Sequence, residues 1–324
     1  MSLVQAAQNA DTTFRDIPII DLQNTTNLRS NTALQKALAD QVRDACINVG
    51  FFYVKNHGIA EATISSALSL TKSFFSLPIE NKMKLDFIKT PNFKGYNAVL
   101  TSNNDPYNNG DMHEGFEFGW ESLRVDPFKS ANDPKLPNQG AMAGANVWPK
   151  DVPGFREAVL RYYHAAVLLG KELFPLFALA LNLPMDFFDN KTKNSAAIMR
   201  MLHYPPQTGP VDDRVIGIEP GIQALQVLSA DKKWIDAPPI PGTLVINLGD
   251  QFARWTNDVF RSTVHRAMNR SGVHRYSVPL FFGTDYDVRL ESIPSCVNED
   301  RPPRYEVVVA GDYVKERLKA TYGH

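Results

Sequence analysis

The residues with the clearest chemical potential lie in two runs, Ser262-Thr-Val-His-Arg266 and Arg275-Tyr-Ser277. Alternation along a strand places Arg275 and Ser277 on one face, where a guanidinium fork and a hydroxyl together can hold a carboxylate. A buried arginine needs an anion, and none is adjacent in the sequence. His265 alone would be typical of a hydrogen-bonded core histidine, but an imidazole near a basic fork indicates a metal site that also binds an acid.

These residues belong to the later part of a chain whose character changes near Ala197. From there, short apolar segments alternate with turns, which is typical of a sandwich or barrel: 197–203, 222–228, 243–247, 262–267 and 276–282. The earlier part predicts a strand at 17–21, helices at 34–49 and 61–75, and a long helix around 159–177. Asn31 is a plausible N-cap of the first of these helices. Residues 88–150 are rich in Asn, Pro, Gly and Asp and predict long irregular loops.

Composition points to an ordinary soluble protein with a sizeable core. The chain has 324 residues, of which 44% are hydrophobic and 21% charged, and its net charge of -1 offers no basic field for nucleic acid. The start lacks a secretory signal, and the apolar window 165–183 is interrupted by Lys171, Glu172 and Pro175. The scarce cysteines, Cys46 and Cys296, predict buried structural thiols. We expect a cytoplasmic monomer that binds a small molecule and neither nucleic acid nor membrane.

A family resemblance becomes specific at the run from Pro239 to Ser277, which resembles the second half of the isopenicillin N synthase-like oxygenases. These proteins use iron(II) and usually 2-oxoglutarate. Further ordered matches cover nearly the whole chain: Ile17-Pro-Ile-Ile-Asp21, Gly50-Phe-Phe-Tyr-Val-Lys-Asn-His-Gly-Ile59, Phe75-Phe-Ser-Leu-Pro78, Lys94-Gly-Tyr96 and Tyr204-Pro-Pro206. The resemblance implies an α+β fold, in which a double-stranded β-helix (jelly-roll) core carries a helical N-terminal part packed around it.

The same resemblance implies how the chain divides and what the matched residues do. It implies an N-terminal helical/β region of the non-haem dioxygenase type at 1–125, a loop and long helix at 126–195, and the jelly-roll oxygenase domain with a C-terminal tail at 196–324. His265 matches the distal histidine of the 2-His-1-carboxylate iron triad. Arg275 and Ser277 match the pair that binds the distal carboxylate of 2-oxoglutarate, and Tyr204 matches a tyrosine that contacts this co-substrate. Iron(II), 2-oxoglutarate and molecular oxygen are the implied cofactor and co-substrates.

The other histidines have weaker claims to the site. His57 lies in an Asn-His-Gly turn and is expected to be structural. His113 is expected to be a polar loop residue, with a substrate contact as the alternative. We expect His203 to point away from the pocket. The remaining three are poor ligand candidates: His164, His274 and His324.

The chain departs from the family at the other two iron ligands. The family requires a His-x-Asp or His-x-Glu pair upstream of the distal histidine, and this sequence contains neither. Matching flanks meet at the Ile218/Glu219 junction, as if a short segment had been excised. Such an excision would remove one inward strand, leaving backbone hydrogen bonds unpaired and part of the core unfilled. Asp212, Asp213 and Glu219 are not fixed opposite His265, so tight iron binding is not expected.

Two explanations of the junction compete. In one, an exon boundary is misplaced and the real protein is a working oxygenase. In the other, the chain is a truncated, inactive relative.

The leading functional hypothesis is an iron(II)/2-oxoglutarate-dependent oxidoreductase that hydroxylates, desaturates or cyclises a small molecule in specialised metabolism. The alternatives are an oxidase that takes no 2-oxoglutarate, a non-catalytic carboxylate-binding protein, and a remnant that does not fold. Four aromatic residues suggest a partly aromatic pocket: Phe93, Tyr96, Phe116 and Phe118.

Overall fold

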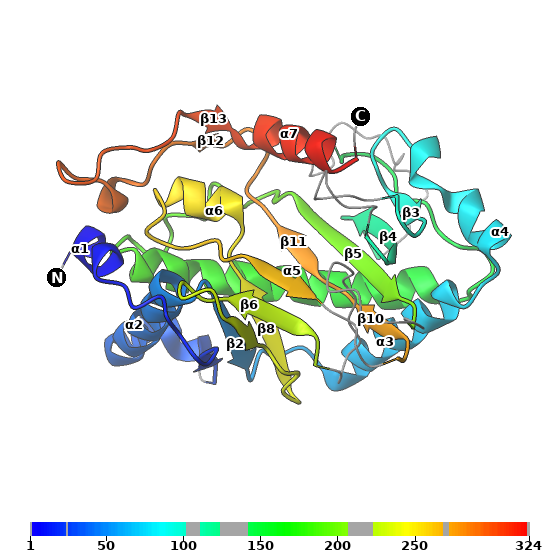
Figure 1. The fold of residues 1–324 in the computed structure, drawn as a ribbon, viewed down its shortest axis with the longest axis horizontal. Coiled ribbons are helices and arrows are strands. Elements are labelled where there is room, and N and C mark those ends of the chain that lie inside the picture. Colours follow the sequence, from blue (N-terminus) through cyan, green and yellow to red (C-terminus); the bar gives the residue numbers. More distant parts are fainter. Residues whose placement is uncertain are drawn as a thin grey trace.

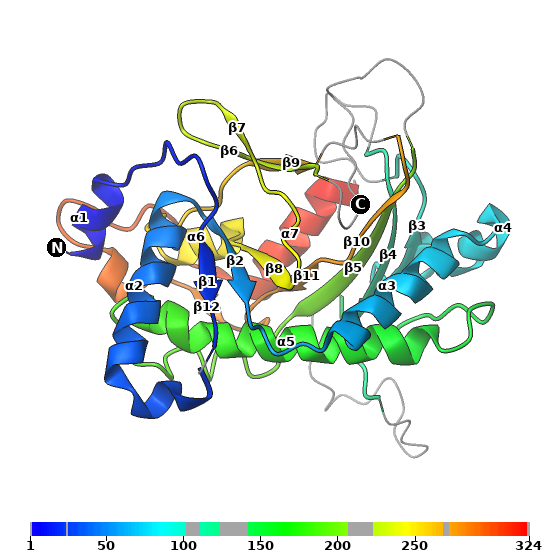
Figure 2. The ribbon, with the colours of Figure 1, turned by 90° about the horizontal axis from the view of Figure 1, so that it is seen from below.

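A long helix, α5 (Phe155–Ala180), runs along one side of the sheets (Figures 1 and 2). The computed structural model describes residues 2–23, 25–101, 111–123, 142–206, 223–267 and 272–322. Helices α2 (Thr32–Asn48) and α3 (Glu61–Phe75) both contact α5. The other helices of the described part are short or terminal: α1 (Leu3–Gln8), α4 (Ile79–Lys82), α6 (Asp250–Trp255) and α7 (Ala310–Tyr322).

The helices begin and end where local chemistry dictates. The side chain of Asn31 accepts a hydrogen bond from the backbone N–H of Leu34 at 3.0 Å, which caps α2 as predicted. Gly50 follows α2 with a φ of 75°, a conformation that glycine adopts without strain. Pro175 lies inside α5. By length and composition, α5 is the one described helix apolar enough to cross a membrane, and its buried residues belong to the two largest hydrophobic clusters.

The strands form three main sheets. The first has the order β1 (Ile19–Asp21), β2 (Phe51–Lys55), β8 (Thr243–Asn247). The second has the order β10 (Arg275–Ser277), β5 (Ala197–Tyr204), β4 (Glu114–Gly119), β3 (Gly95–Asn97), with β11 (Leu280–Phe282) also on β5. The third has the order β7 (Trp234–Asp236), β6 (Leu225–Leu228), β9 (His265–Ala267). A separate pair joins β12 (Arg289–Leu290) and β13 (Val308–Val309).

Alternation along these strands separates an outer face, which packs on helices, from an inner face. In the second sheet, Phe116 and Met201 share a hydrophobic cluster with residues of α3 and α5. In the first sheet, Phe52 and Val54 share another with α2 and α5. The inner faces pack against one another in two smaller clusters. One joins Phe51 and Tyr53 to Val227, and the other joins Leu202 and Tyr204 to Leu225 and Ala267. All three sheets therefore enclose one interior, as the jelly-roll prediction requires.

Two sequence predictions have clear outcomes here. Cys46 and Cys296 are both buried free thiols, as predicted, and burial raises the pKa of each. The prediction of irregular loops at 88–150 is wrong where β3 and β4 form an antiparallel pair and β4 also pairs with β5. These strands form because Phe116 and Phe118 bury one face of β4 against the helices.

The inner side of the first sheet is incomplete among the described residues. Within the described ranges, β8 pairs with β2 alone. Val245 lies opposite Tyr53 on the inner face and is 39% exposed, and Phe281, inward on β11, is 57% exposed. An edge without a partner among the described strands and exposed apolar side chains on an inner face are what a missing inward strand would produce. The Ile218/Glu219 junction itself, with Asp212 and Asp213, lies outside the described residues.

Candidate active site

His265 begins β9 opposite Val227, on the inner face of the third sheet. Its ring contacts Phe51 edge-on, with 5.1 Å between the ring centroids. Its Nδ1 lies 3.0 Å from the carbonyl oxygen of Thr263. Because a carbonyl only accepts hydrogen bonds, Nδ1 must carry the proton, which leaves the lone pair of Nε2 available. That is the tautomer of a metal-ligating histidine held by a backbone carbonyl.

Arg275, Ser277 and Tyr204 lie together on the inner face of the second sheet. In the antiparallel register, Arg275 pairs with Tyr204 and Ser277 pairs with Leu202. The guanidinium carbon of Arg275 is 5.4 Å from the Tyr204 ring centroid, and Arg275 is only 9% exposed. Burial raises the pKa of the Tyr204 hydroxyl, so this group stays a neutral hydrogen-bond donor. The predicted arrangement of a buried arginine and a serine on one strand face is confirmed.

The fourth predicted residue, His265, faces the same interior as these three. Ala267 lies two positions after His265 on β9, so alternation places both on one face. Ala267 packs against the cluster that contains Leu202 and Tyr204. The fold thus brings together residues from β5, β9 and β10, which are far apart in the sequence.

A row of polar residues next to Tyr204 was missed by the sequence interpretation. His113 lies in the loop before β4, as predicted, but it is only 7% exposed, and its ring centroid lies 5.1 Å from that of Tyr204. Arg200 Nε lies 3.0 Å from Glu117 Oε1 in a buried ion pair. The run Glu114-Gly-Phe-Glu-Phe-Gly119 carried the signal, because its phenylalanines alternate with glycine and glutamate.

The suggestion of a partly aromatic pocket is wrong for Tyr96, Phe116 and Phe118. All three belong to the outer hydrophobic cluster between the second sheet and the helices. Burial among these side chains stabilises the fold and leaves none of the three rings on the inner face. The wall of the interior along β3 and β4 is polar instead. Phe93 is partly buried in the turn before β3, with a φ of 58°.

The remaining histidines behave largely as expected. His203 points outward, as predicted, with its Nδ1 2.7 Å from Glu114 Oε1 and its Nε2 2.9 Å from His274 Nδ1. His57 accepts a hydrogen bond from the Ile59 backbone N–H at 3.2 Å, which fits its predicted role in a turn. His164 lies within α5, its Nε2 2.8 Å from the carbonyl oxygen of Glu121. His324 lies outside the described residues.

Comparison with known proteins finds two matching family descriptions and several similar full-length proteins. Residues 17–151 match the family described as non-haem dioxygenase in morphine synthesis N-terminal, and residues 196–284 match the 2OG-Fe(II) oxygenase superfamily. A 2-oxoglutarate-Fe(II) type oxidoreductase, hxnY, of Emericella nidulans is 33% identical over 90% of this chain and 86% of its own length. The chain belongs to the iron(II)/2-oxoglutarate-dependent oxygenases.

Two further similar proteins support the same family. A 2-oxoglutarate-Fe(II) type oxidoreductase, ppzC, of Metarhizium majus is 33% identical over 94% of this chain and 87% of its own length. A full-length Neurospora crassa protein, solved in complex with alpha-KG and 5-formyluracil, superposes with a TM-score of 0.77 at 26% identity. That match covers 97% of this chain and 100% of the other. The family uses iron(II), 2-oxoglutarate and molecular oxygen, so by family the chain is a 2-oxoglutarate-dependent dioxygenase with a jelly-roll core.

The described residues of this oxygenase fit the co-substrate but not the metal. A buried guanidinium beside a tyrosine hydroxyl suits a carboxylate. Iron(II) in this family takes two histidines and a carboxylate on one face. In the described part of the chain, no group of three or more His, Cys, Asp and Glu residues could hold a metal ion. His265 supplies one imidazole, and one imidazole does not make a tight iron site.

Proposed function

We propose that Arg275, Ser277 and Tyr204 bind the distal carboxylate of 2-oxoglutarate in this oxygenase and that His265 is an iron ligand. The buried guanidinium of Arg275, facing the interior beside Tyr204, is the observation that carries the proposal. A guanidinium fork beside a tyrosine matches the planar, two-oxygen shape of a carboxylate, and a diacid co-substrate supplies one. The tautomer of His265, with Nε2 available, supports its role as a ligand.

On this proposal, the two remaining iron ligands belong to a strand missing at the Ile218/Glu219 junction. The edge of β8 that has no partner among the described strands and the exposed inward side chains of Val245 and Phe281 support it. The rest of the site is intact, which favours a misplaced exon boundary over gradual decay of an inactive relative. Sequencing the transcript across the Ile218 and Glu219 codons tests this. We expect additional codons that include His-x-Asp or His-x-Glu, and a transcript without them would overturn it.

The substrate is a small molecule, and we propose its hydroxylation, desaturation or ring closure in specialised metabolism. Fungal oxidoreductases among the relatives support this setting. The same proposal includes a cytoplasmic monomer without nucleic-acid or membrane partners, supported by the net charge of -1 and the two buried free thiols. It keeps the division of the chain at 1–125, 126–195 and 196–324.

Replacing Arg275 tests the co-substrate site directly. We expect the purified chain to bind 2-oxoglutarate in isothermal titration, and Arg275→Gln to weaken binding roughly tenfold to a hundredfold, because a charge-assisted pair is lost. Arg289→Gln on β12 is the matched control, since Arg289 is exposed, and it should bind like the unmodified chain. No binding by the unmodified chain, or equal binding by both variants, would contradict the proposal. The former would favour an oxidase that takes no 2-oxoglutarate.

A further inference from the structure

A polar row on the inner faces of β3, β4 and β5 adjoins the proposed co-substrate site. In the register, Asn97 pairs with Gly115, Gly115 pairs with Leu202, and Glu117 pairs with Arg200. Their strand neighbours Tyr96, Phe116 and Met201 pack outward in the helix-facing cluster, so alternation turns this row inward. Arg200 and Arg275 both act on the Tyr204 hydroxyl electrostatically, which places the row beside the arginine proposed to hold 2-oxoglutarate.

Two opposite charges of this row, on Glu117 and Arg200, pair with each other. Glu117 and Arg200 form an ion pair of 3.0 Å, in which the side chains are 4% and 13% exposed. Arg200 Nη2 also lies 3.3 Å from His113 Nε2. Burial, and after it the charge of Arg200, lowers the pKa of His113 to about 3, so this imidazole is neutral near pH 7. A neutral ligand beside this row would leave the Glu117–Arg200 ion pair undisturbed, whereas a charged ligand would compete with it.

Asn97 is the unsatisfied member of the row. It is 2% exposed, and neither its Oδ1 nor its Nδ2 has a hydrogen-bond partner within the described part of the chain. Leaving a buried amide unpaired costs roughly 1–3 kcal/mol, so such a group is rare unless a ligand pairs with it. The pairing partner across the strand, Gly115, has no side chain to cover the amide. A β-carbon there would make only ordinary contacts, the nearest with Leu202 Cδ2 at 3.5 Å, so packing does not demand glycine.

We propose that Asn97 is a substrate-recognition residue and that it selects a neutral group with a hydrogen-bond donor and acceptor side by side, such as a lactam, imide or carboxamide. A carboxamide offers an acceptor and donors in one plane, so it pairs through two parallel hydrogen bonds with the edge of another amide. This inference rests on the proposed function, because the ligand would lie beside the bound 2-oxoglutarate.

The test measures binding of 2-quinolone, a planar lactam, to the purified chain by ligand-observed NMR with saturating 2-oxoglutarate. N-methyl-2-quinolone, which lacks the donor, is the paired probe. We expect 2-quinolone to bind at least about tenfold more tightly than the methylated probe, a difference of about one well-made hydrogen bond. Equal binding of the two probes, or binding of neither, would overturn the inference.

Two variants separate recognition from structure. Asn97→Leu, which keeps the branched shape of the side chain, should lose the preference for 2-quinolone while its melting temperature stays equal or rises, because an unpaired buried amide is removed. Gly115→Ala should weaken 2-quinolone binding, since its methyl group would lie next to Asn97, with which Gly115 pairs across the strands. Asn9→Leu, at the exposed end of α1, is the matched control and should leave binding unchanged. A lower melting temperature of Asn97→Leu, or an unchanged preference, would show that Asn97 does not recognise the ligand.

Failure of this inference can be told from failure of the proposed function. Titration of 2-oxoglutarate into Asn97→Leu should give the affinity of the unmodified chain, because Asn97 is not among the residues proposed to hold the diacid. If the unmodified chain binds 2-oxoglutarate and shows no preference for the lactam, only the substrate assignment fails. If it does not bind 2-oxoglutarate at all, the co-substrate assignment fails first.

Discussion

Two buried asparagines show what separates the structural part of the interior from the binding part. Asn257, after α6, is fully buried and uses its whole side chain. Its Nδ2 donates to the carbonyls of Cys296 and Pro302 at 3.3 Å and 3.2 Å, and its Oδ1 accepts from the Arg304 N–H at 2.9 Å. Asn97, nearly as buried, has no partner for either amide atom among the described residues.

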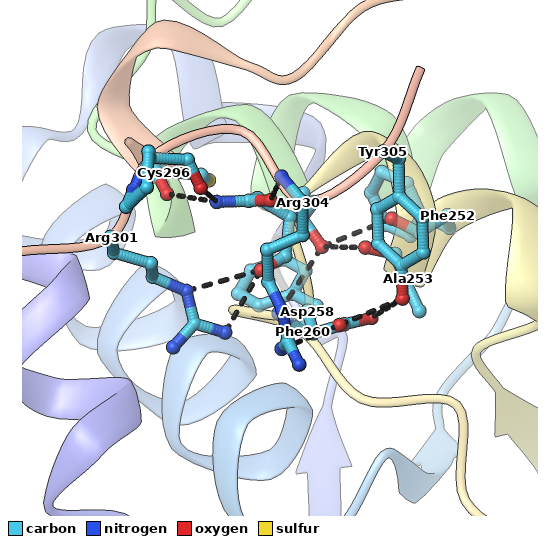
Figure 3. A network of polar contacts seen from close by, with 11 residues as sticks. Phe252, Ala253, Asp258, Phe260, Cys296, Arg301, Arg304 and Tyr305 are labelled. Atoms are coloured by element: carbon cyan, nitrogen blue, oxygen red, sulfur yellow. Dashed lines mark hydrogen bonds and ion pairs between the residues drawn. The ribbon is translucent and has the colours of Figure 1, made fainter. Parts of the chain in front are cut away.

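The surroundings of Asn257 complete a closed polar network that ties the C-terminal segment to the loop after α6 (Figure 3). The Arg301 guanidinium donates to the Asn257 carbonyl at 2.9 Å and 3.1 Å. Arg304 pairs with Asp258, and the Tyr305 hydroxyl donates to the same carboxylate. A network satisfied by its own chain holds a fold together, whereas an unsatisfied amide beside the proposed co-substrate site fits the proposal that a ligand pairs with it.

The largest expected effect is the loss of Asn257. Asn257→Ala leaves two carbonyls and one N–H without their partner and puts alanine at a φ of 52°. We expect a loss of about 4 kcal/mol in the free energy of unfolding, measured by chemical denaturation. Asn257→Gly should cost about 1 kcal/mol less, because glycine tolerates this φ. A loss below about 1 kcal/mol for the alanine variant would erase the contrast between the two asparagines.

The stability of the protein at acidic pH tests whether the buried His113 imidazole, near Asn97, is neutral. The folded pKa of His113 is about 3, whereas an unfolded histidine titrates near 6.5. Between these values the unfolded chain binds a proton that the folded chain does not, so stability is lost as the pH falls. In this window, the uptake of a proton by unfolded His113 should lower the free energy of unfolding by up to about 1.4 kcal/mol for each pH unit of acidification. Denaturation midpoints of His113→Gln should therefore fall less steeply below pH 6.5, and a parallel pH profile would count against a buried neutral imidazole.

A smaller effect of opposite sign is expected at Asn97. Asn97→Leu should raise the free energy of unfolding by roughly 1 kcal/mol, since it removes an unpaired buried amide and keeps the branched shape of the side chain. Its denaturation curve, measured beside that of the Asn257 variant, compares the two positions directly. Destabilisation by Asn97→Leu would mean that the fold itself uses this amide.

The smallest effect is expected at the rim of the polar network. Arg304 Nη1 lies 2.7 Å from Asp258 Oδ2, but the arginine side chain is 54% exposed. Arg304→Ala should lower the free energy of unfolding by about 0.5 kcal/mol, because water screens exposed ion pairs. If Arg304→Ala lowers the free energy of unfolding nearly as much as Asn257→Ala, the ion pair would stabilise the network as much as the buried amide does, against this account.

The sequence predicted those helices and strands whose pattern of hydrophobic residues can be recognised within one short segment. Helices α2 and α3 and strand β8 formed at the expected places because their periodicity is local, and α2 is also capped by the nearby Asn31. Strands β3 and β4 were missed because residues 88–150 are dominated by turn-forming residues that mask two short strands. Their pairing partner, β5, lies far away in the sequence.

In the candidate site, too, the features within one strand were predictable and those that depend on pairing between strands were not. Arg275 and Ser277 were predictable, because both lie on one strand and share a face by simple alternation. The Glu117–Arg200 pair and the open amide of Asn97 depend on the register between strands, which the local sequence does not specify.

The central claim is that this chain keeps the 2-oxoglutarate site but supplies one iron ligand, His265, in its described part. Titration of 2-oxoglutarate with and without Fe(II), under anaerobic conditions, tests it most directly. Two ligands that touch at one site must change each other's affinity reciprocally. The account predicts the same 2-oxoglutarate affinity with and without Fe(II) and a large loss in Arg275→Gln. A marked tightening by stoichiometric Fe(II) would contradict it, because iron would then be held in the site.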